Sequence, residues 1–174
     1  MPLIKNGRVV ADRYVTVLDD APLPDGAPVI VTAARFLADP DDILDRQGPV
    51  GVAWPNNRRV EELAPYLDRL ALVVLAFPNF KDGRAYSQAR LLRERYGFPG
   101  ELRASGQILR DQFLFLVRAG FDALNVAKDS DVEAFEAALA RYSVFYQPAG
   151  EGRIPAARRR VARLGAAVSG EAVN

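Results

Sequence analysis

The stretch LALVVLAF, residues 70–77, is a run of eight apolar residues. It lacks the alternation of polar and apolar residues that marks a strand with one face in water. Such a run is typical of a strand of a parallel sheet that helices cover on both faces. The stretch therefore predicts a central strand and an α/β fold around it.

Four shorter apolar runs flank this strand, and segments of helical periodicity separate them. The runs are VIVTA (29–33), VGVAW (50–54), ELRA (101–104) and DALNV (122–126). Five strand–helix units in succession imply right-handed crossovers and a mainly parallel sheet. Because five units are too few for an eight-stranded barrel, we expect an open, doubly wound sheet, with a partial TIM-like barrel as the alternative.

The two ends of the chain differ from this central pattern. Residues 3–18 alternate apolar and polar side chains around Asn6 and Gly7, which predicts an N-terminal β-hairpin or edge ribbon. Residues 151–174 contain five arginines and lack large core residues, so we expect a flexible tail after a single domain of residues 1–150. The tail could touch RNA or an acidic partner, although such tails are more often simply solvated.

Three helices have features that define them further. Pro65 interrupts an apolar pattern that starts at Val60, so that helix should be kinked or short. Ser130 and Glu133 have capping-box spacing at the start of the last helix. The helix over 108–119 is apolar over a wide arc, which could bury a second subunit in a homo-oligomer.

The composition excludes several kinds of chemistry. The 174 residues include no cysteine and no histidine. Disulfides, thiolate metal sites and thiol nucleophiles are therefore excluded, and histidine cannot serve as a general base or metal ligand. We expect no metal site and no resident cofactor, although a diffusible flavin or nicotinamide remains compatible with the sequence.

Charge and hydropathy suggest a cytoplasmic protein. The net charge is +1, but residues 151–174 carry +3, so the rest of the chain is slightly acidic. A nucleic-acid-binding domain would carry a basic face, which makes nucleic acid an unexpected partner. No apolar run reaches the roughly 20 residues of a membrane span, and residues 1–10 lack the apolar stretch of a signal peptide.

Polar residues gather where the expected strands end. In parallel sheets, ligands usually bind beyond the carboxyl ends of the strands. Asp82 could cap a helix there, Gly83 would let a ligand approach the backbone, and Arg103 could close the other side with bidentate hydrogen bonds. The expected anion-binding residues are Asn79, Asp82, Gly83, Arg84, Tyr86, Ser87, Arg103 and Ser105.

The same residues also fit an interpretation without a ligand. Asp82 would then act only as the N-cap, Arg84 would be a solvated helix residue, and Ser105 would cap the next helix. Tyr86 is more often a packing residue than a proton donor. The sequence leaves both interpretations open, and it identifies no catalytic residue.

Nucleotide-binding and hydrolase fingerprints are lacking: there is no G-x-G-x-x-G, no G-x-x-x-x-G-K-[ST] and no G-x-S-x-G. Three motifs nevertheless point to a family. DGRAYSQARLLR (82–93), GELRASG (100–106) and LRDQ (109–112) resemble an uncharacterised bacterial family, domain of unknown function 934, whose members are described as oxidoreductases involved in sulfite reduction. The likeness is dense over residues 77–124 and looser from Pro2 to Tyr146. In that family the position of Gln107 is usually an aspartate, so a role for that carboxylate is in doubt here.

The resemblance implies a role in assimilatory sulfate or sulfite reduction. Sulfite reductase or another sulfur-pathway enzyme is then the implied partner. One hypothesis is a protein that binds a small oxyanion at the strand ends. The alternatives are a non-catalytic accessory protein that docks through helix 108–119, and an enzyme that acts on a phosphorylated metabolite. Whether the chain is an enzyme stays open.

Overall fold

The structure is a computed structural model that describes residues 2–5, 8–126, 132, 133 and 137. Within this part of the chain, eight strands form one sheet in the order β2-β1-β8-β7-β6-β5-β4-β3. The strands are β1 (Leu3–Lys5), β2 (Arg8–Val10), β3 (Val15–Thr16), β4 (Val29–Thr32), β5 (Val50–Trp54), β6 (Leu72–Phe77), β7 (Glu101–Gly106) and β8 (Ala123–Asn125). Neighbours from β3 to β8 are parallel, whereas β1 is antiparallel to both β8 and β2.

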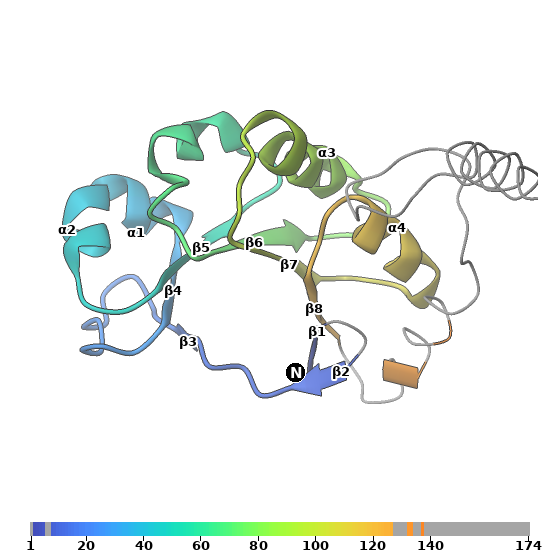
Figure 1. The fold of residues 1–174 in the computed structure, drawn as a ribbon, viewed down its shortest axis with the longest axis horizontal. Coiled ribbons are helices and arrows are strands. Elements are labelled where there is room, and N and C mark those ends of the chain that lie inside the picture. The colour runs from blue at the N-terminus through green and yellow to red at the C-terminus, as the bar shows by residue number, and fades with distance from the viewer. Residues whose placement is uncertain (1, 6–7, 127–131, 134–136, 138–174) are drawn as a thin grey trace, which may run out of the picture.

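The sheet curls into an arch with the helices outside it (Figure 1). From β3 to β8 the spatial order equals the order in the sequence, so every right-handed crossover places its helix on the same face. The expectation of a doubly wound sheet is therefore wrong. The alternative of a partial barrel describes the observed half-barrel, although it has antiparallel strands at one edge.

The described helices are short and follow local signals. They are α1 (Ala33–Ala38), α2 (Pro40–Asp45), α3 (Arg84–Arg90), α4 (Phe113–Arg118), the 3-10 helices η1 (Val60–Tyr66) and η3 (Arg110–Gln112), and the π-helix η2 (Leu91–Arg95). Thr32 caps α1 by accepting a hydrogen bond from the Arg35 N–H at 3.1 Å. Pro65 lies inside η1, which is a 3-10 helix rather than an α-helix.

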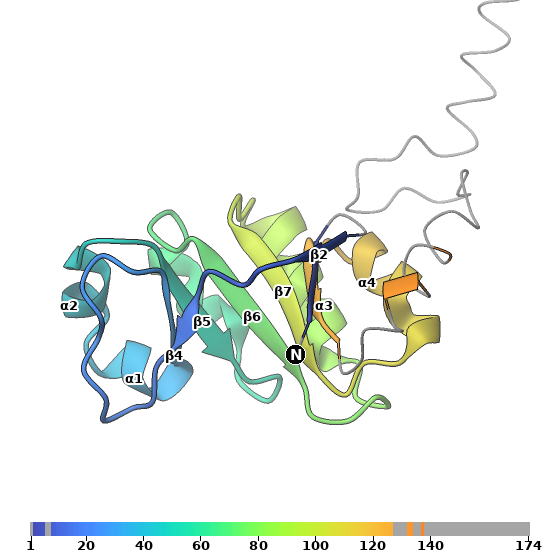
Figure 2. The same cartoon turned by 90° about the horizontal axis from the view of Figure 1, so that it is seen from below.

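The N-terminal segment spans the open side of the arch. β1 and β2 are paired as an antiparallel ribbon, with Leu3 opposite Val10. The expected ribbon does not continue to residue 18, because β3 instead pairs with β4 at the far edge of the sheet. Residues 11–14, which we call the strap, connect the two edges and cross the concave face (Figures 1 and 2).

Both faces of β6 are buried, as its sequence predicted. Val73, Leu75 and Phe77 join the main core beneath the helices. Leu72 and Val74 point to the concave face, where they form a small cluster with Ile30 that Tyr14 and Ala53 flank. The second apolar face of β6 is thus covered from the strap side and not by a second layer of helices.

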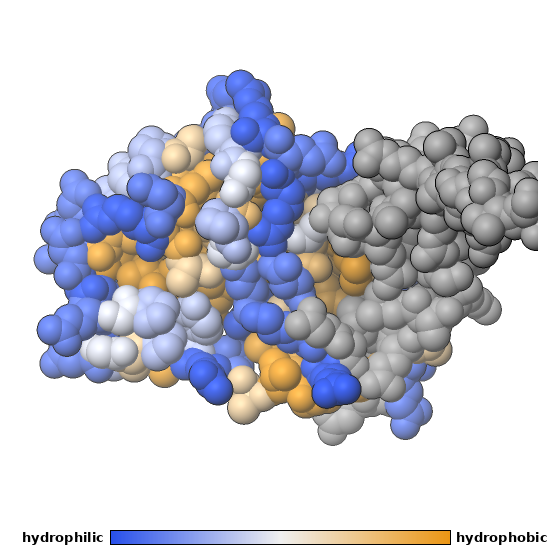
Figure 3. All heavy atoms as spheres, in the orientation of Figure 1, coloured by the Kyte–Doolittle hydropathy of each residue, from blue (hydrophilic) through white to orange (hydrophobic). Residues whose placement is uncertain are grey.

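The space-filling view agrees with this arrangement. Hydrophobic residues are visible between the helices and the sheet, and hydrophilic residues surround them (Figure 3). No helix in the described part of the chain combines the length and apolarity needed to cross a bilayer. The expected tail over 151–174 and most of the expected helix after β8 lie outside the described residues.

Candidate functional site

The loop after β6 folds around its own polar side chains. Asn79 Oδ1 accepts a hydrogen bond from the Lys81 N–H at 2.9 Å. The Asp82 carboxylate accepts one from the Arg84 N–H at 3.2 Å and others from the Arg84 Nε and Nη2 atoms at 2.9 and 2.6 Å. The N-cap residue of α3 is Gly83, so the prediction of Asp82 as the N-cap is off by one residue.

This contact changes the ionisation of both partners. Hydrogen bonds from Arg84 hold the pKa of the Asp82 carboxyl well below its usual range, and Asp82 in turn raises the pKa of Arg84. The Arg84 guanidinium is therefore paired with a carboxylate of its own loop, although its side chain is 58% exposed. An anion at this loop would have to compete with Asp82.

Three other predicted residues lie nearby in different settings. Tyr86 packs edge-on against Phe77, with ring centroids 5.1 Å apart, and burial raises its pKa to about 12. It therefore stays protonated near neutral pH. Ser87 follows it in α3, whereas Ser105 lies inside β7 opposite Ala76 and caps no described helix.

Arg103 belongs to a different part of the molecule. It is opposite Val74 in the sheet, and its side chain lies on the concave face, away from the helices that include Arg84. Its exposed fraction is only 1%. The structure thus does not place Arg103 across a common pocket from the loop after β6.

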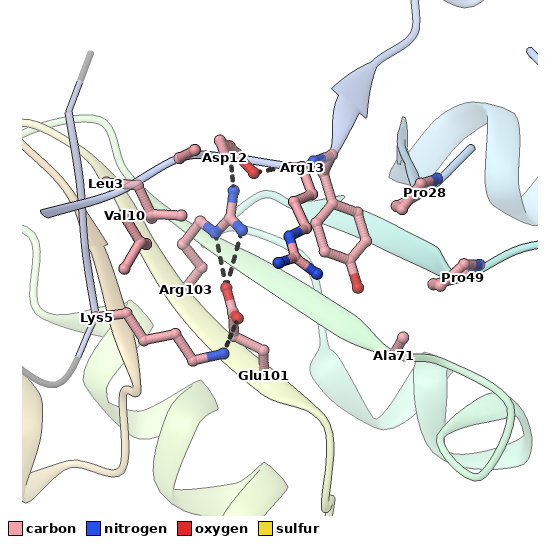
Figure 4. Close-up of a pocket in the computed structure, with 12 residues that line it drawn as sticks. Leu3, Lys5, Val10, Asp12, Arg13, Pro28, Pro49, Ala71, Glu101 and Arg103 are labelled. Atoms are coloured by element: carbon pink, nitrogen blue, oxygen red, sulfur yellow. Dashed lines mark hydrogen bonds and ion pairs between the residues drawn. The ribbon is translucent and has the colours of Figure 1, made fainter.

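A network of ion pairs surrounds Arg103 (Figure 4). Its Nη1 atom lies 2.6 Å from Asp12 Oδ2, and its Nη2 atom lies 2.9 Å from Glu101 Oε1. Lys5 Nζ contacts the other oxygen of Glu101 at 2.6 Å. The guanidinium carbon also lies 5.5 Å from the centre of the Tyr14 ring, a distance that allows a cation–π contact.

A cavity of about 520 Å³ opens between this network and the strap. It lies at the amino ends of the parallel strands, because Pro28, Pro49 and Ala71 directly precede β4, β5 and β6. This is the opposite end from the one that the sequence predicted. Its lining residues are Leu3, Lys5, Val10, Ala11, Asp12, Arg13, Tyr14, Pro28, Pro49, Ala71, Glu101 and Arg103.

The two carboxylates of this cavity are engaged in ion pairs with cations of the same cavity. Glu101 and Asp12 already accept hydrogen bonds from Lys5 and Arg103. Arg13 is exposed, reaches from the strap into the cavity, and forms no ion pair with any residue that the structure describes. Burial and the nearby Glu101 charge raise the pKa of Tyr14, so its hydroxyl stays protonated.

Sequence reasoning identified Arg103 but missed the other polar members of this cavity: Lys5, Asp12, Arg13, Tyr14 and Glu101. One signal was present in the run ELRA. Glu101 and Arg103 alternate with Leu102 and Ala104, so one face of β7 had to be polar. The contribution from residues 5 and 12–14 depends on a contact between chain segments about 90 residues apart, for which the sequence gives no local signal.

The fold and cavity define a class of protein: an α/β half-barrel with a strap across its open side and an ion-paired cavity beneath the strap. The chain belongs to the family described as "Bacterial protein of unknown function (DUF934)", which matches residues 51–157, more than half of its length. The match includes Glu101 and Arg103 but starts after the strap. No curated protein matches the chain.

Proposed function

We propose that this protein binds a small organic anion in the cavity beneath the strap and serves assimilatory sulfate or sulfite reduction in the cytoplasm. The observation that carries the proposal is the Arg13 guanidinium, which reaches into a cavity whose two carboxylates are already paired. The pathway rests on the resemblance to proteins described as involved in sulfite reduction.

The charges favour an anion over a cation. Lys5, Arg13 and Arg103 bring three positive charges to the cavity, and Asp12 and Glu101 bring two negative ones. The groups that remain available to a ligand are N–H and O–H donors, so the ligand should supply acceptors. Arginine suits this role because its guanidinium binds sulfate, sulfonate and phosphate groups through paired hydrogen bonds.

The size favours an organic anion over an inorganic one. Small-molecule sites are typically of about 300–1,000 Å³, and the cavity of about 520 Å³ falls in this range. Sulfite or sulfate alone would occupy only part of it. The apolar wall of Leu3, Val10 and the two prolines would contact the body of the ligand, while Arg13 holds its charged group.

Thermal unfolding with a panel of ligands tests this proposal. The panel is sulfite, sulfate, phosphate, adenosine phosphosulfate, flavin mononucleotide and a nicotinamide dinucleotide. A ligand at 100 times its Kd stabilises the native state by about 2.7 kcal/mol, so selective binding would raise the Tm visibly. We expect the largest rise with an organic anion of the panel, and no rise with any member at millimolar concentration would overturn the proposal.

Three arginine variants locate the site. Arg13→Gln should abolish the rise in Tm, whereas Arg8→Gln, on exposed β2 and outside the cavity lining, should leave it unchanged. The competing location is the loop after β6, with Asn79, Asp82 and Arg84. Loss of binding in Arg84→Gln with normal binding in Arg13→Gln would move the site to that loop.

A further inference from the structure

Tyr14 brings a second kind of hydrogen-bond donor to the cavity beneath the strap. Its side chain is half-buried and lines the cavity, as does that of Arg13, its neighbour in the chain. The Tyr14 hydroxyl donates to no residue that the structure describes. The hydroxyl of a buried tyrosine usually has a hydrogen-bond partner. The cavity therefore contains a neutral donor without a protein partner as well as a cation without one.

Contacts of the ring and of the backbone fix the position of Tyr14. Its ring packs against the apolar cluster of the concave face, and the Arg103 guanidinium carbon lies 5.5 Å from the ring centre. Asp12 Oδ1 accepts a hydrogen bond from the Tyr14 N–H at 3.1 Å, while Asp12 Oδ2 lies 2.6 Å from Arg103 Nη1. Tyr14 is thus positioned before a ligand arrives, which lowers the entropic cost of binding.

The acceptors of the cavity are engaged with other donors. Glu101 Oε1 accepts a hydrogen bond from Arg103 Nε at 3.0 Å, and Glu101 Oε2 lies 2.6 Å from Lys5 Nζ. Both oxygens of Asp12 have the partners given above. The backbone carbonyls of the three lining residues that precede β4, β5 and β6 accept hydrogen bonds from backbone N–H groups. None of these oxygens accepts from the Tyr14 hydroxyl, which is left for a ligand.

The charges of the cavity favour a ligand with one negative charge. Its three cations and two carboxylates sum to +1, and Arg13 is the cation without a carboxylate partner among the described residues. A second negative charge on the ligand would therefore have no unpaired cation to face. Burial and the Glu101 charge raise the pKa of Tyr14, so its hydroxyl remains a donor near neutral pH. A neutral acceptor suits such a donor.

We propose that Tyr14 determines the specificity of this cavity by selecting a monoanion that also carries a neutral acceptor, such as an amide or ketone carbonyl. The carbonyl oxygen accepts a hydrogen bond from the Tyr14 hydroxyl while Arg13 binds the anionic group. This inference rests on the proposed function, because the anion site must exist for Tyr14 to act on its ligand. An anion without the carbonyl leaves the hydroxyl unpaired, and a dianion leaves a charge unpaired, so both are disfavoured.

Three sulfonates with the same three-carbon chain test the inference. 4-Sulfobutanamide ends in a neutral amide, pentane-1-sulfonate in an ethyl group of similar size, and 4-sulfobutanoate in a carboxylate. The flexible chain lets the end group reach Tyr14 while the sulfonate binds Arg13. NMR titration of the backbone amide signals of the full chain gives each Kd. We expect the parent chain to bind the amide about fivefold more tightly than the carboxylate.

A conservative variant isolates the hydroxyl. Tyr14→Phe keeps the ring, so it should weaken binding of 4-sulfobutanamide about fivefold and leave that of pentane-1-sulfonate within about twofold. Tyr66→Phe is the matched control, because Tyr66 is half-buried, packs edge-on against Phe36 and lies outside the cavity lining. It should change neither Kd. Arg13→Gln should weaken binding of all three sulfonates.

The comparison between ligands separates recognition from packing. Equal weakening of the amide and of pentane-1-sulfonate in Tyr14→Phe would make Tyr14 a packing residue and overturn the inference, while the anion site would stand. Tighter binding of 4-sulfobutanoate than of the amide by the parent chain would also overturn it. If the parent chain bound none of the three sulfonates, the inference would fail, whereas the anion site itself is decided by the thermal unfolding panel. Thermal unfolding of each variant verifies its folding.

Discussion

Arg103 connects three segments that are distant in the sequence. Its guanidinium contacts Glu101 within the same strand and Asp12 on the strap, while Glu101 also binds Lys5 on β1. Burying a charge is costly unless ion pairs and hydrogen bonds replace the lost water. In Arg103 the Nε, Nη1 and Nη2 atoms all have such partners.

Replacing Arg103 should therefore be strongly destabilising. Arg103→Met keeps much of the side-chain volume but leaves Glu101 with one cation and Asp12 with none of its present ion pairs. We expect a loss of about 3 kcal/mol in the free energy of unfolding, measured by urea denaturation. An equally stable or more stable variant would show that apolar packing can replace the network.

Double-mutant cycles separate the contributions that Asp12 and Glu101 make to stability through their ion pairs with Arg103. Asp12 is 35% exposed and Glu101 only 12%, so water screens the Asp12 pair more strongly. The coupling free energy between Arg103→Met and Asp12→Asn should be about 1 kcal/mol or less. The coupling free energy between Arg103→Met and Glu101→Gln should be larger. The reverse order would mean that the strap contact dominates.

At the scale of elements, the turn between β6 and α3 should be sensitive to acid. The folded-state pKa of Asp82 lies below the unfolded value of 3.8. The contact with Arg84 therefore contributes its full stability above pH 3.8 and loses it as the pH falls toward the folded-state pKa. Asp82→Asn should flatten the fall in stability below about pH 4, measured by urea unfolding at several pH values.

Arg84→Gln is the natural companion to this experiment. Because hydrogen bonds from Arg84 are the main cause of the lowered pKa, its removal should flatten the same part of the pH profile. A profile that Asp82→Asn changes and Arg84→Gln leaves intact would assign the effect to another partner, such as Asn56, which also lowers this pKa.

The end of β7 needs a glycine for two reasons. Gly106 has a φ of +108°, and a Cβ there would lie 2.3 Å from the Phe77 carbonyl oxygen on β6. Gly97, with a φ of +61° and no atom within 4 Å of its Cβ position, is a matched control that has the backbone strain alone. We expect Gly106→Ala to destabilise by at least about 2 kcal/mol and Gly97→Ala by about 1 kcal/mol, measured by urea denaturation. Equal costs would show that β7 can shift away from Phe77.

The elements themselves were largely predictable from the sequence. All five expected strands are present, because short apolar runs and their flanking breaks are local signals. The structure that covers the second face of the sheet could not be predicted in the same way. The apolar residues Leu72 and Val74 show that the second face of β6 is covered. The sequence pattern would be the same, however, whether a layer of helices or a strap covered that face. Arg103 was placed at the wrong end for the same reason, since its partner Asp12, and Lys5, which pairs with the neighbouring Glu101, come from a distant part of the chain.

On the scale of the whole molecule, the strap covers the face of the sheet that a second layer of helices would otherwise cover. A curled sheet that stops at a half-barrel leaves a concave face open and two edge strands unpaired. In this protein both edge strands are very short, with three residues in β2 and two in β3. The strap joins these edges and covers the apolar cluster of Ile30, Leu72 and Val74 with Tyr14.

The strap should open as a unit without unfolding the rest of the sheet. It is held by the Asp12–Arg103 pair and by two hydrogen bonds of the following strand, from the Val15 N–H to the Pro28 carbonyl and from the Val17 N–H to the Ile30 carbonyl, both at 2.9 Å. Asp12→Asn should therefore speed amide hydrogen exchange at Val15 and Val17 about fivefold, which corresponds to about 1 kcal/mol. Exchange in the centre of β6 should not change, because opening at one edge leaves its partners β5 and β7 in place. Faster exchange in β6 by the same factor would mean that the strap and the sheet open together.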